Sequence, residues 1–347
     1  MRELMRGETA ATQGRDPAWR LHHHNQTVWR EVFALCEEAR RSLDLEQYIF
    51  AAEGVGRRLL DLLARQARRG IAVRVLADGV GSRGLARSEG GRALIRAGGE
   101  IALYNGLAEA ARRPFRSLPR LHRKTVLADG RSLMLGGSCY IDRMSDWRDT
   151  MIRIDGPVPP AVSASFQTAW AAARRAPAPA PTPTPGARLW PGGRWSYALS
   201  GPQAEAAPGL GETLLARIAG ARRAVTLTTP YLIPDRRLRR ALLAARKAGA
   251  RVRILMPARS DHPPLDLVGR RFARALARRG VEVHGYAPTM LHAKIALVDG
   301  EWGGVSSFNL DVFSLRLNLE NGVASRSPAF CEALAERLER DFAAASS

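Results

Sequence analysis

Two histidines and two lysines stand in a decapeptide that the chain contains twice. The first copy reads LHRKTVLADG at residues 121–130 and the second reads LHAKIALVDG at residues 291–300, with six of the ten positions identical. In each copy one residue separates the His from the Lys. Because alternate residues of a β-strand point to the same face, we expect the two side chains of each pair to project together.

Two such pairs around one small volume would suit a phosphate group. The pairs are His122 with Lys124 and His292 with Lys294. Potentially cationic groups repel one another unless an anion lies among them. One imidazole could attack phosphorus while the other protonates the leaving oxygen, and the lysines could neutralise the remaining oxygens. One His-x-Lys alone is a weak signal, but two copies in matched repeats can be brought to one cleft.

An attacking imidazole needs one ring nitrogen held, and a carboxylate is its usual partner. Asp149 lies 27 residues after His122, and Glu320 lies 28 residues after His292. The similar separation in the two halves favours both acids as orienting groups, with an ordinary surface acid as the alternative for each.

Each decapeptide ends in Asp-Gly and continues with the alternation of a β-hairpin. Asp-Gly is a preferred pair for the tight turn of such a hairpin. We therefore expect Asp129 and Asp299 to form turns rather than to act in catalysis.

The decapeptides belong to a longer internal duplication. In both halves a strand with Tyr, a helix, a strand, a helix and a further strand precede the decapeptide, and this alternation predicts an α/β fold. Alternating Pro and Ala between the halves predict an extended linker. We expect domains at 1–172 and 193–347 joined by a linker at 173–192.

Apolar residues at helical spacing predict helices over 31–42, 55–69, 211–223, 236–248 and 268–279.

Composition narrows the classes of protein. The 347 residues carry a net charge of +20, which favours a polyanionic partner, either nucleic acid or an anionic membrane surface. No apolar stretch reaches membrane-span length, and the first residues lack a signal core, so we expect neither an integral anchor nor a cleaved leader. Cys36, Cys139 and Cys331 have no metal-ligand spacing, and their odd number suits a reducing compartment.

These motifs resemble the phospholipase D superfamily, whose signature is His-x-Lys-x4-Asp followed by six residues and a Gly/Ser-rich turn with Asn. Both decapeptides fit it, and the second continues to Asn309. Longer phrases are similar to short bacterial cardiolipin synthases without transmembrane helices: VLADGVGS (75–82), DWRDTMIRIDGPV (146–158), TTPYLIPD (228–235), MLHAKIALVDG (290–300) and SSFNLDVFSLRLNLENGV (306–323).

The resemblance implies two pseudo-twofold-related α/β domains, each a mixed sheet flanked by helices, with the active site at their interface. It implies a set of catalytic residues, namely His122, Lys124, His292, Lys294, Asp149, Glu320 and Asn309, with Ser138 and Ser307 in substrate binding. We expect His122 to be the nucleophile and His292 the acid and base, although pseudo-symmetry allows the reverse. The chain departs from the pattern at Cys139, which replaces Asn, and at Ser306, which replaces Gly.

The function implied is a phosphatidyltransferase that makes cardiolipin from phosphatidylglycerol, or from another donor lipid and alcohol, through a phosphatidyl-histidine. Neither a cofactor nor a metal ion is expected, because two lysines supply positive charge. A phospholipase D-type hydrolase, a nuclease of the same superfamily and a non-catalytic binder of anionic membranes are the alternatives. Only 6% of the residues are aromatic, which is sparse for stacking on bases, so nucleic acid is not the expected partner.

A lipid substrate has to be reached at a membrane surface. Residues 106–120 combine four arginines with Leu107, Phe115 and Leu118, a composition typical of an interfacial segment, with a plain connecting loop as the alternative. We expect a peripheral protein at the cytoplasmic face of the bacterial membrane. The sequence gives no oligomeric state.

Overall fold

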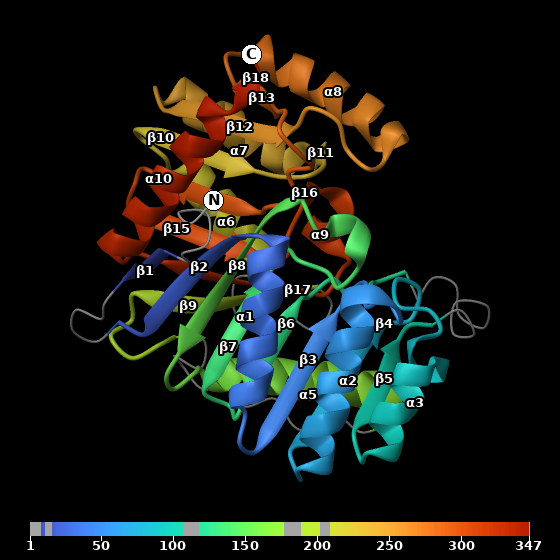
Figure 1. Ribbon diagram of the computed structural model, residues 1–347. Coiled ribbons are helices and arrows are strands. Elements are labelled where there is room, and N and C mark those ends of the chain that lie inside the picture. Colours follow the sequence, from blue (N-terminus) through green and yellow to red (C-terminus); the bar gives the residue numbers. More distant parts are fainter. Residues whose placement is uncertain (1–7, 11–15, 107–117, 177–188, 202–208, 347) are drawn as a thin grey trace.

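Two mixed β-sheets form the frame of the protein, and each half of the chain builds one of them (Figure 1). The computed structural model describes residues 8–10, 16–106, 118–176, 189–201 and 209–346. In order across the first sheet, the strands are β1 (Glu8–Ala10), β2 (Ala18–His24), β8 (Arg148–Asp155), β7 (Ser132–Gly136), β6 (Thr125–Ala128), β3 (Ser42–Gln47), β4 (Ala72–Asp78) and β5 (Glu100–Tyr104). The second sheet runs β18 (Ala345–Ser346), β13 (Glu282–Tyr286), β12 (Arg251–Pro257), β10 (Ala224–Thr228), β14 (Ile295–Val298), β15 (Trp302–Ser306), β17 (Glu320–Ser325) and β9 (Trp195–Ser200).

Seven strands of one sheet correspond to seven of the other in the same order. The run β2-β8-β7-β6-β3-β4-β5 matches β9-β17-β15-β14-β10-β12-β13. In each run the last three strands are parallel and the others pair antiparallel. Parallel neighbours need a crossover, which a helix provides, whereas the antiparallel pairs include tight hairpins. The predicted duplication and the two mixed sheets are therefore confirmed.

Helices cover the outer faces of the sheets and also fill the space between them. The outer helices are α1 (Asn25–Glu38), α2 (Gly54–Arg68) and α3 (Glu89–Arg96) in the first half and α6 (Leu210–Ala219), α7 (Arg236–Lys247) and α8 (Pro263–Ala277) in the second. One further helix follows the last large strand of each half. It is α5 (Pro160–Arg174) in the first half and α10 (Pro328–Ala343) in the second. Short elements near the site are the 3-10 helices at Leu85–Arg87 and Asp142–Met144, strands β11 (Leu232–Ile233) and β16 (Leu310–Asp311), and helix α9 (Val312–Arg316).

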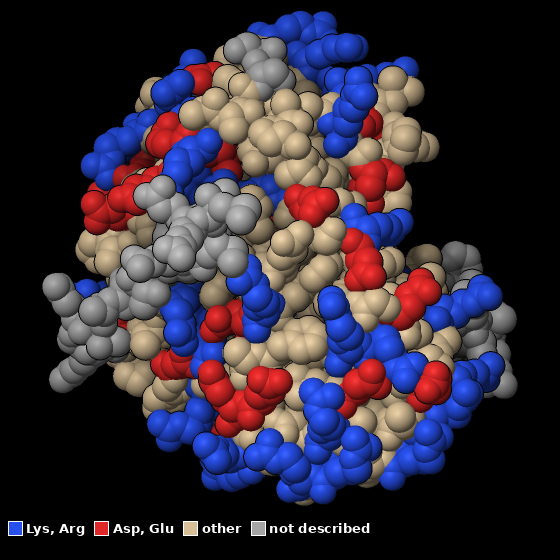
Figure 2. Space-filling model, viewed as in Figure 1, with Lys and Arg blue, Asp and Glu red and all other residues tan. Residues whose placement is uncertain are grey.

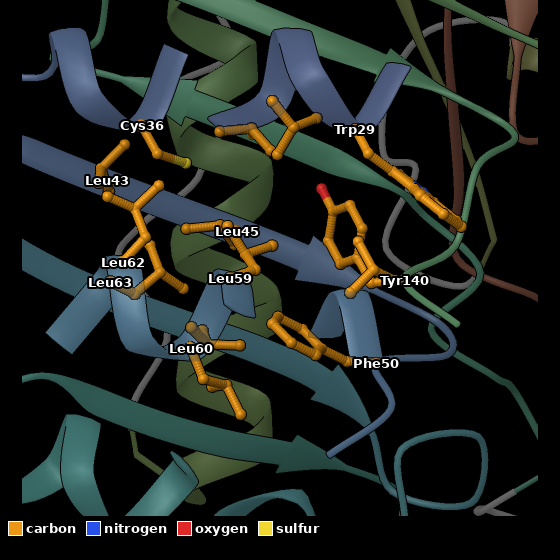
Figure 3. Close-up of a cluster of buried hydrophobic side chains, with 14 of the residues drawn as sticks. Trp29, Cys36, Leu43, Leu45, Phe50, Leu59, Leu60, Leu62, Leu63 and Tyr140 are labelled. Atoms are coloured by element: carbon orange, nitrogen blue, oxygen red, sulfur yellow. The ribbon is translucent and has the colours of Figure 1, made fainter. Parts of the chain in front are cut away.

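The hydrophobic core has separate outer parts and a shared inner part. In the first half, leucines of α2 and β3 pack with Phe50 and Tyr140 beneath α1 (Figure 3). The inner part joins the two halves, since Trp19 of the first sheet contacts both Trp195 of β9 and Phe330 of α10. The two sheets are thus held together by apolar burial over their facing sides.

The Asp of each decapeptide fastens its hairpin to the adjacent strand. Asp129 has a left-handed φ of 56°, and its carboxylate accepts hydrogen bonds of 2.7–2.9 Å from the backbone N–H groups of residues 40–42. Asp299, with a φ of 54°, does the same for residues 222–224 at 2.7–2.9 Å. Both lie at the opposite end of the strand from the His and Lys, in turns that join β6 to β7 and β14 to β15.

The predicted linker at 173–192 lies largely outside the described residues. Its flanks are structured, because α5 continues to Arg174 and Trp190 is buried. Chain segments on both sides thus belong to the packed halves, and the division into domains stays a prediction. In the described part of the chain, no helix has both the length and the apolar character needed to cross a bilayer.

We expect Asp129→Ala and Asp299→Ala each to lower the free energy of unfolding by about 2 kcal/mol, because each removes a charged acceptor from three N–H groups and leaves a left-handed residue. Glu301→Ala is the matched control, since Glu301 lies in the same turn and makes only an exposed ion pair with Arg223, for which we expect less than about 1 kcal/mol. Urea unfolding measures all three. If both Asp variants lose no more unfolding free energy than the control does, the proposed role of the two aspartates in fastening the hairpins would be wrong.

Candidate active site

The two decapeptides are joined to the opposite halves of the protein by short backbone bridges. Leu121 forms a parallel bridge with Leu319, and the His122 N–H donates to the Leu319 carbonyl at 3.0 Å. The second copy repeats this arrangement, with a parallel bridge between Leu291 and Arg148 and a 2.8 Å bond from the N–H of the next residue to the Arg148 carbonyl. Each histidine therefore lies beside the strand that carries the other half's predicted acid.

The histidines and the acids pair across the two halves. His122 Nδ1 lies 2.9 Å from both carboxylate oxygens of Glu320. His292 Nδ1 lies 2.6 Å from Asp149 Oδ2. Both acids are completely buried. The similar spacing in the two halves associates each acid with the histidine of its own half, and the structure corrects that association. Contact with a carboxylate places the proton on Nδ1 and leaves the Nε2 lone pair available.

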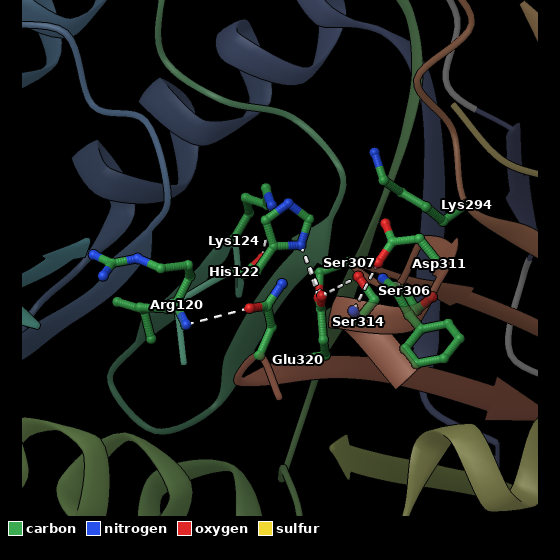
Figure 4. A network of polar contacts seen from close by, with 12 residues as sticks. Arg120, His122, Lys124, Lys294, Ser306, Ser307, Asp311, Ser314 and Glu320 are labelled. Carbon is green, nitrogen blue, oxygen red and sulfur yellow. Dashed lines mark hydrogen bonds and ion pairs between the residues drawn. The ribbon is translucent and has the colours of Figure 1, made fainter. Parts of the chain in front are cut away.

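Two hydroxyl groups from the segment 307–314, which contains Asn309, hold Glu320 (Figure 4). Ser307 Oγ donates to one carboxylate oxygen at 2.5 Å, and Ser314 Oγ of α9 donates to the other at 2.7 Å. Burial favours the neutral acid, but His122, Lys124 and these contacts outweigh it, so the pKa of Glu320 lies below its ordinary value. The hydroxyl of Ser307, which was predicted to bind substrate, thus donates to Glu320. Ser314 was not predicted.

Asp149 is held in a different way. A Cβ at Gly137 would lie 2.2 Å from Asp149 Oδ1, so only glycine leaves room for this carboxylate. Ser307 occupies the corresponding position of the second half. The Thr150 N–H also donates to Asp149 at 2.7 Å. Burial raises the pKa of Asp149, but Lys294 and His292 outweigh it and the result is a pKa below the ordinary value.

Each lysine turns back onto the histidine that precedes it. Lys124 Nζ donates to the His122 carbonyl at 2.6 Å. Lys294 Nζ donates to the His292 carbonyl and lies 2.9 Å from His292 Nδ1. These residues lie just before β6 and β14 rather than within them. Both lysines are buried, and burial lowers the pKa of Lys294 to about 8 and also lowers that of Lys124.

The histidines are neutral at neutral pH in this arrangement. Burial, together with the charge of Lys294, lowers the pKa of His292 to about 4 against the opposing effect of Asp149. Burial also lowers the pKa of His122. An anion beside the rings would favour their charged forms. The site therefore presents two neutral imidazoles, of which one could attack and the other could take up a proton.

Two aromatic side chains that were not assigned to the site lie against the imidazoles. The Tyr48 ring packs edge-on to His122 with centroids 4.9 Å apart, and Lys124 Nζ lies 5.2 Å from the same ring. Trp147 lies 5.3 Å from His292. The signal for Tyr48 is its place in the repeated strand, and that for Trp147 is the motif DWRDT.

Ser138, Ser307 and Asn309, the polar residues predicted in the two Gly/Ser-rich turns, are all buried. Asn309 Oδ1 and Ser138 Oγ have no hydrogen-bond partner among the described residues, so the amide oxygen could still accept a bond and the hydroxyl could donate or accept one. Cys139, which replaces the family's Asn, is 1% exposed, and the charges of Lys124 and Lys294 both act on its thiol. Burial nevertheless raises the pKa of Cys139.

An ion pair between the buried Asp78 and the partly buried Arg120 positions the segment that leads to His122. Asp78 accepts bonds from Arg120 at 2.7 and 3.0 Å and from the Leu121 N–H at 3.0 Å. Arg120 was expected to face a membrane as part of 106–120, and its pairing with Asp78 corrects that expectation. Leu118 is 52% exposed, whereas residues 107–117, which include the other three arginines, lie outside the described part.

A second ion pair lies next to Asp149. Arg148 donates to Asp341 of α10 at 3.0 and 2.5 Å and to Thr150 Oγ1 at 2.7 Å, and both members of the ion pair are completely buried. Removing one partner of such a pair is strongly destabilising, because the other charge stays buried. This pair fixes the strand from which Asp149 projects.

Two halves that each contribute a His-x-Lys segment to a shared centre define a phospholipase D-like protein. A family model described as "Cardiolipin synthase, PLD-like domain" matches residues 32–170 and 214–343. The chain belongs to this family.

Known relatives agree with that assignment. The chain is 33% identical over 327 residues to cardiolipin synthase A of Pseudomonas entomophila (strain L48), an alignment of 91% of this chain and 67% of the relative. It is 27% identical to the probable cardiolipin synthase YwiE of Bacillus subtilis (strain 168), over 92% of this chain and 64% of that protein. The chain thus spans about two thirds of the length of these relatives.

Solved structures share the fold. The crystal structure of phosphatidylserine synthase from Haemophilus influenzae Rd KW20 matches with a TM-score of 0.73 at 15% identity, covering 98% of this chain and 89% of that one. Polyphosphate kinase from Porphyromonas gingivalis matches with a TM-score of 0.60 at 16% identity, over 92% of this chain and 46% of the kinase. At such identities the likeness concerns the fold alone.

We expect Gly137→Ala to break the hydrogen bond between Asp149 and His292 while that of His122 stays intact, because the new methyl group would occupy the position of the carboxylate. ¹⁵N NMR of the two imidazoles measures this directly. The free energy of unfolding should also fall by about 1–3 kcal/mol, as is typical of overpacking. Gly106→Ala is the control, since a Cβ there meets no atom within 4 Å. An unchanged His292 spectrum in Gly137→Ala would contradict this account.

Proposed function

We propose that this protein is a phosphatidyltransferase that makes cardiolipin from two molecules of phosphatidylglycerol. The observation that carries the proposal is the pair of buried His–carboxylate contacts formed across the halves, with a lysine at each histidine. Such an arrangement provides a nucleophile, an acid and base, and positive charge around one phosphate. The family supplies the class of substrate.

In the first step His122 Nε2 attacks the phosphorus of the donor lipid. The bond between phosphorus and the glycerol oxygen breaks, and that oxygen takes a proton from the protonated His292. The products are a phosphatidyl-histidine and free glycerol. Glu320 keeps the attacking ring oriented and stabilises its developing positive charge. We assign the attack to His122 because two hydroxyl groups fix Glu320, whereas Lys294 reduces the basicity of His292.

In the second step a hydroxyl of the acceptor lipid attacks the same phosphorus. His292, now neutral, removes the hydroxyl proton, and the bond between phosphorus and His122 breaks. This regenerates both histidines and releases cardiolipin. Water in place of the acceptor would give phosphatidic acid, which is the hydrolase alternative.

Lys124 and Lys294 neutralise the phosphate oxygens that take no part in bond exchange. Ser138, whose buried Oγ has no partner among the described residues, is our choice for a further donor to those oxygens, and Asn309 would join it through its side-chain NH2 group. Cys139 is a weaker donor than Asn, so the first half contributes less to this contact. The reaction needs no cofactor or metal ion in this scheme, and that stays a prediction.

The place of action that we propose is the anionic lipid surface at the cytoplasmic face of the bacterial membrane, with the protein bound peripherally. The net charge of +20 favours such a surface. Phosphatidylglycerol is itself anionic, so substrate and docking surface have the same charge.

We expect the purified protein to convert phosphatidylglycerol vesicles to cardiolipin plus glycerol, as measured by mass spectrometry of the lipids. His122→Ala and His292→Ala should each abolish product, because both histidines act in both steps. Lys124→Met and Lys294→Met should each lower turnover on the order of 10²-fold. Phosphatidic acid as the main product would indicate a hydrolase, and cleavage of DNA without lipid turnover would indicate a nuclease. Substantial activity in either His variant would remove that residue from the scheme.

The pKa of about 8 for Lys294 leads to a pH prediction. As pH rises through about 8, Lys294 loses its positive charge and phosphate binding weakens, so kcat/KM should fall about tenfold per pH unit above that value. Lys294→Arg keeps its charge and should shift this alkaline decline to higher pH, whereas Lys124→Arg should leave it in place. A decline at the same pH in Lys294→Arg would assign it to another group.

A further inference from the structure

Helix α8 exposes apolar side chains that its counterpart in the first half does not have. Only Gly269 and Leu276 of its fifteen residues are buried. Leu265, Leu267 and Val268 are 38%, 58% and 36% exposed. The corresponding helix α3 has eight residues, of which three are buried. The duplication therefore does not account for this exposed apolar surface.

Basic side chains follow the apolar ones along α8. Arg270, Arg271 and Arg274 are exposed, and within the described chain none of them forms an ion pair with an acid. The acids at the start of the helix are engaged, because Asp261 accepts a bond from Tyr231 at 2.7 Å and Asp266 accepts one from the Ser260 N–H at 3.0 Å. Figure 2 shows uncharged and basic surface side by side over α8.

Helix α8 is linked to the segment that holds Glu320 through the short strands β11 and β16. Gly269 of α8 packs against the backbone of Leu232 in β11, and β11 pairs with β16, which leads directly into α9. Helix α9 has two faces of opposite character. Ser314 is buried and bonds to Glu320, while Phe313 is 61% exposed and Val312 is 38% exposed.

We propose that the exposed residues Leu265, Leu267 and Val268 of α8 and Val312 and Phe313 of α9, here called the docking rim, enter the interface of an anionic lipid bilayer. This inference rests on the proposed function and adds to it the surface by which the active site reaches lipid. The arginines of α8 lie at the level of the lipid phosphates, and the apolar side chains lie below them among the first acyl carbons.

Charge and composition favour a bilayer as the occupant. An interfacial helix combines Leu, Val or Phe on one part of its surface with Arg or Lys beside it, as α8 does. A basic side chain near an anionic surface contributes about 1 kcal/mol, and the exposed arginines of α8 form no ion pair with an acid in the described part of the chain. The rim also adjoins the catalytic centre through Ser314 and Glu320, so docking would place the lipid headgroups next to the site.

The test uses flotation of the full-length protein with vesicles of phosphatidylglycerol and phosphatidylcholine. Leu267→Ser combined with Val268→Ser should weaken partitioning about tenfold or more, by the scale of burying two partly exposed aliphatic side chains. Turnover of short-chain phosphatidylglycerol below its micelle concentration should stay unchanged, because these residues lie away from the histidines. Arg271→Ser with Arg274→Ser should weaken binding to phosphatidylglycerol vesicles selectively.

The matched control is Ile95→Ser on α3, where the side chain is 45% exposed but lies outside the rim. It should bind vesicles as the parent does. In a second measurement, Leu267→Trp should show a blue-shifted emission with phosphatidylglycerol vesicles and none with buffer alone.

Each outcome decides one question. Unchanged partitioning of the Leu267/Val268 double variant, or an equal loss in Ile95→Ser, would overturn the docking rim. A third result would also overturn the docking rim: the parent protein sediments as an oligomer, and the double variant sediments as a monomer and still binds vesicles. The rim would then join two copies of the chain. Vesicle binding by the parent without any cardiolipin formed would refute the proposed function and leave the rim supported.

Discussion

The exchange of carboxylates between the two halves is the constraint on which the structure of the site depends. A buried carboxylate or imidazole is costly unless it is paired, and here neither half can pair its own. Glu320 would be left without His122, and Asp149 without His292, if the halves were separated. The apolar layer that joins the sheets through Trp19, Trp195 and Phe330 therefore acts on the chemistry as well, because it fixes the distance at which these pairs form. Duplication alone would give two incomplete sites, and face-to-face packing makes one complete site.

Within this symmetric frame, the two histidines have different surroundings. Gly137 makes room for Asp149, but its counterpart Ser307 uses a hydroxyl to hold Glu320. Lys294 touches the ring of its histidine, whereas Lys124 contacts only the carbonyl. A transfer reaction needs one imidazole that attacks and another that exchanges protons, and unequal surroundings favour one assignment of these tasks over the other. The first of these differences lies at a turn residue, outside the segments that carry the histidines.

Much of this arrangement could be predicted from the sequence because it is local. The Asp-Gly hairpins, the alternation of strands and helices, and both acids follow from spacing and residue type. The crossed pairing could not be predicted, because the similar separation between histidine and acid in each half does not tell which acid contacts which histidine. Arg120 was misplaced for a related reason: its basic, apolar neighbourhood is typical of a surface segment, and only the fold brings Asp78 beneath it. Helix α3 was expected from the repeat but without bounds, because Gly90 and Gly91 weaken its helical pattern; α2 and residues 85–86 leave space only for small residues there.

The charge balance of the centre explains why it suits a phosphodiester. Two charged lysines offset the two carboxylates, and with both imidazoles neutral the buried set has no net charge. A phosphodiester brings one negative charge, which favours the protonated form of one histidine, the form that the leaving oxygen requires. In the proposed scheme, the attacking ring becomes cationic just as the other ring gives up its proton, so the total stays constant through the step. A buried site tolerates such a reaction because charge moves between groups already held in place, and no additional ion has to be desolvated.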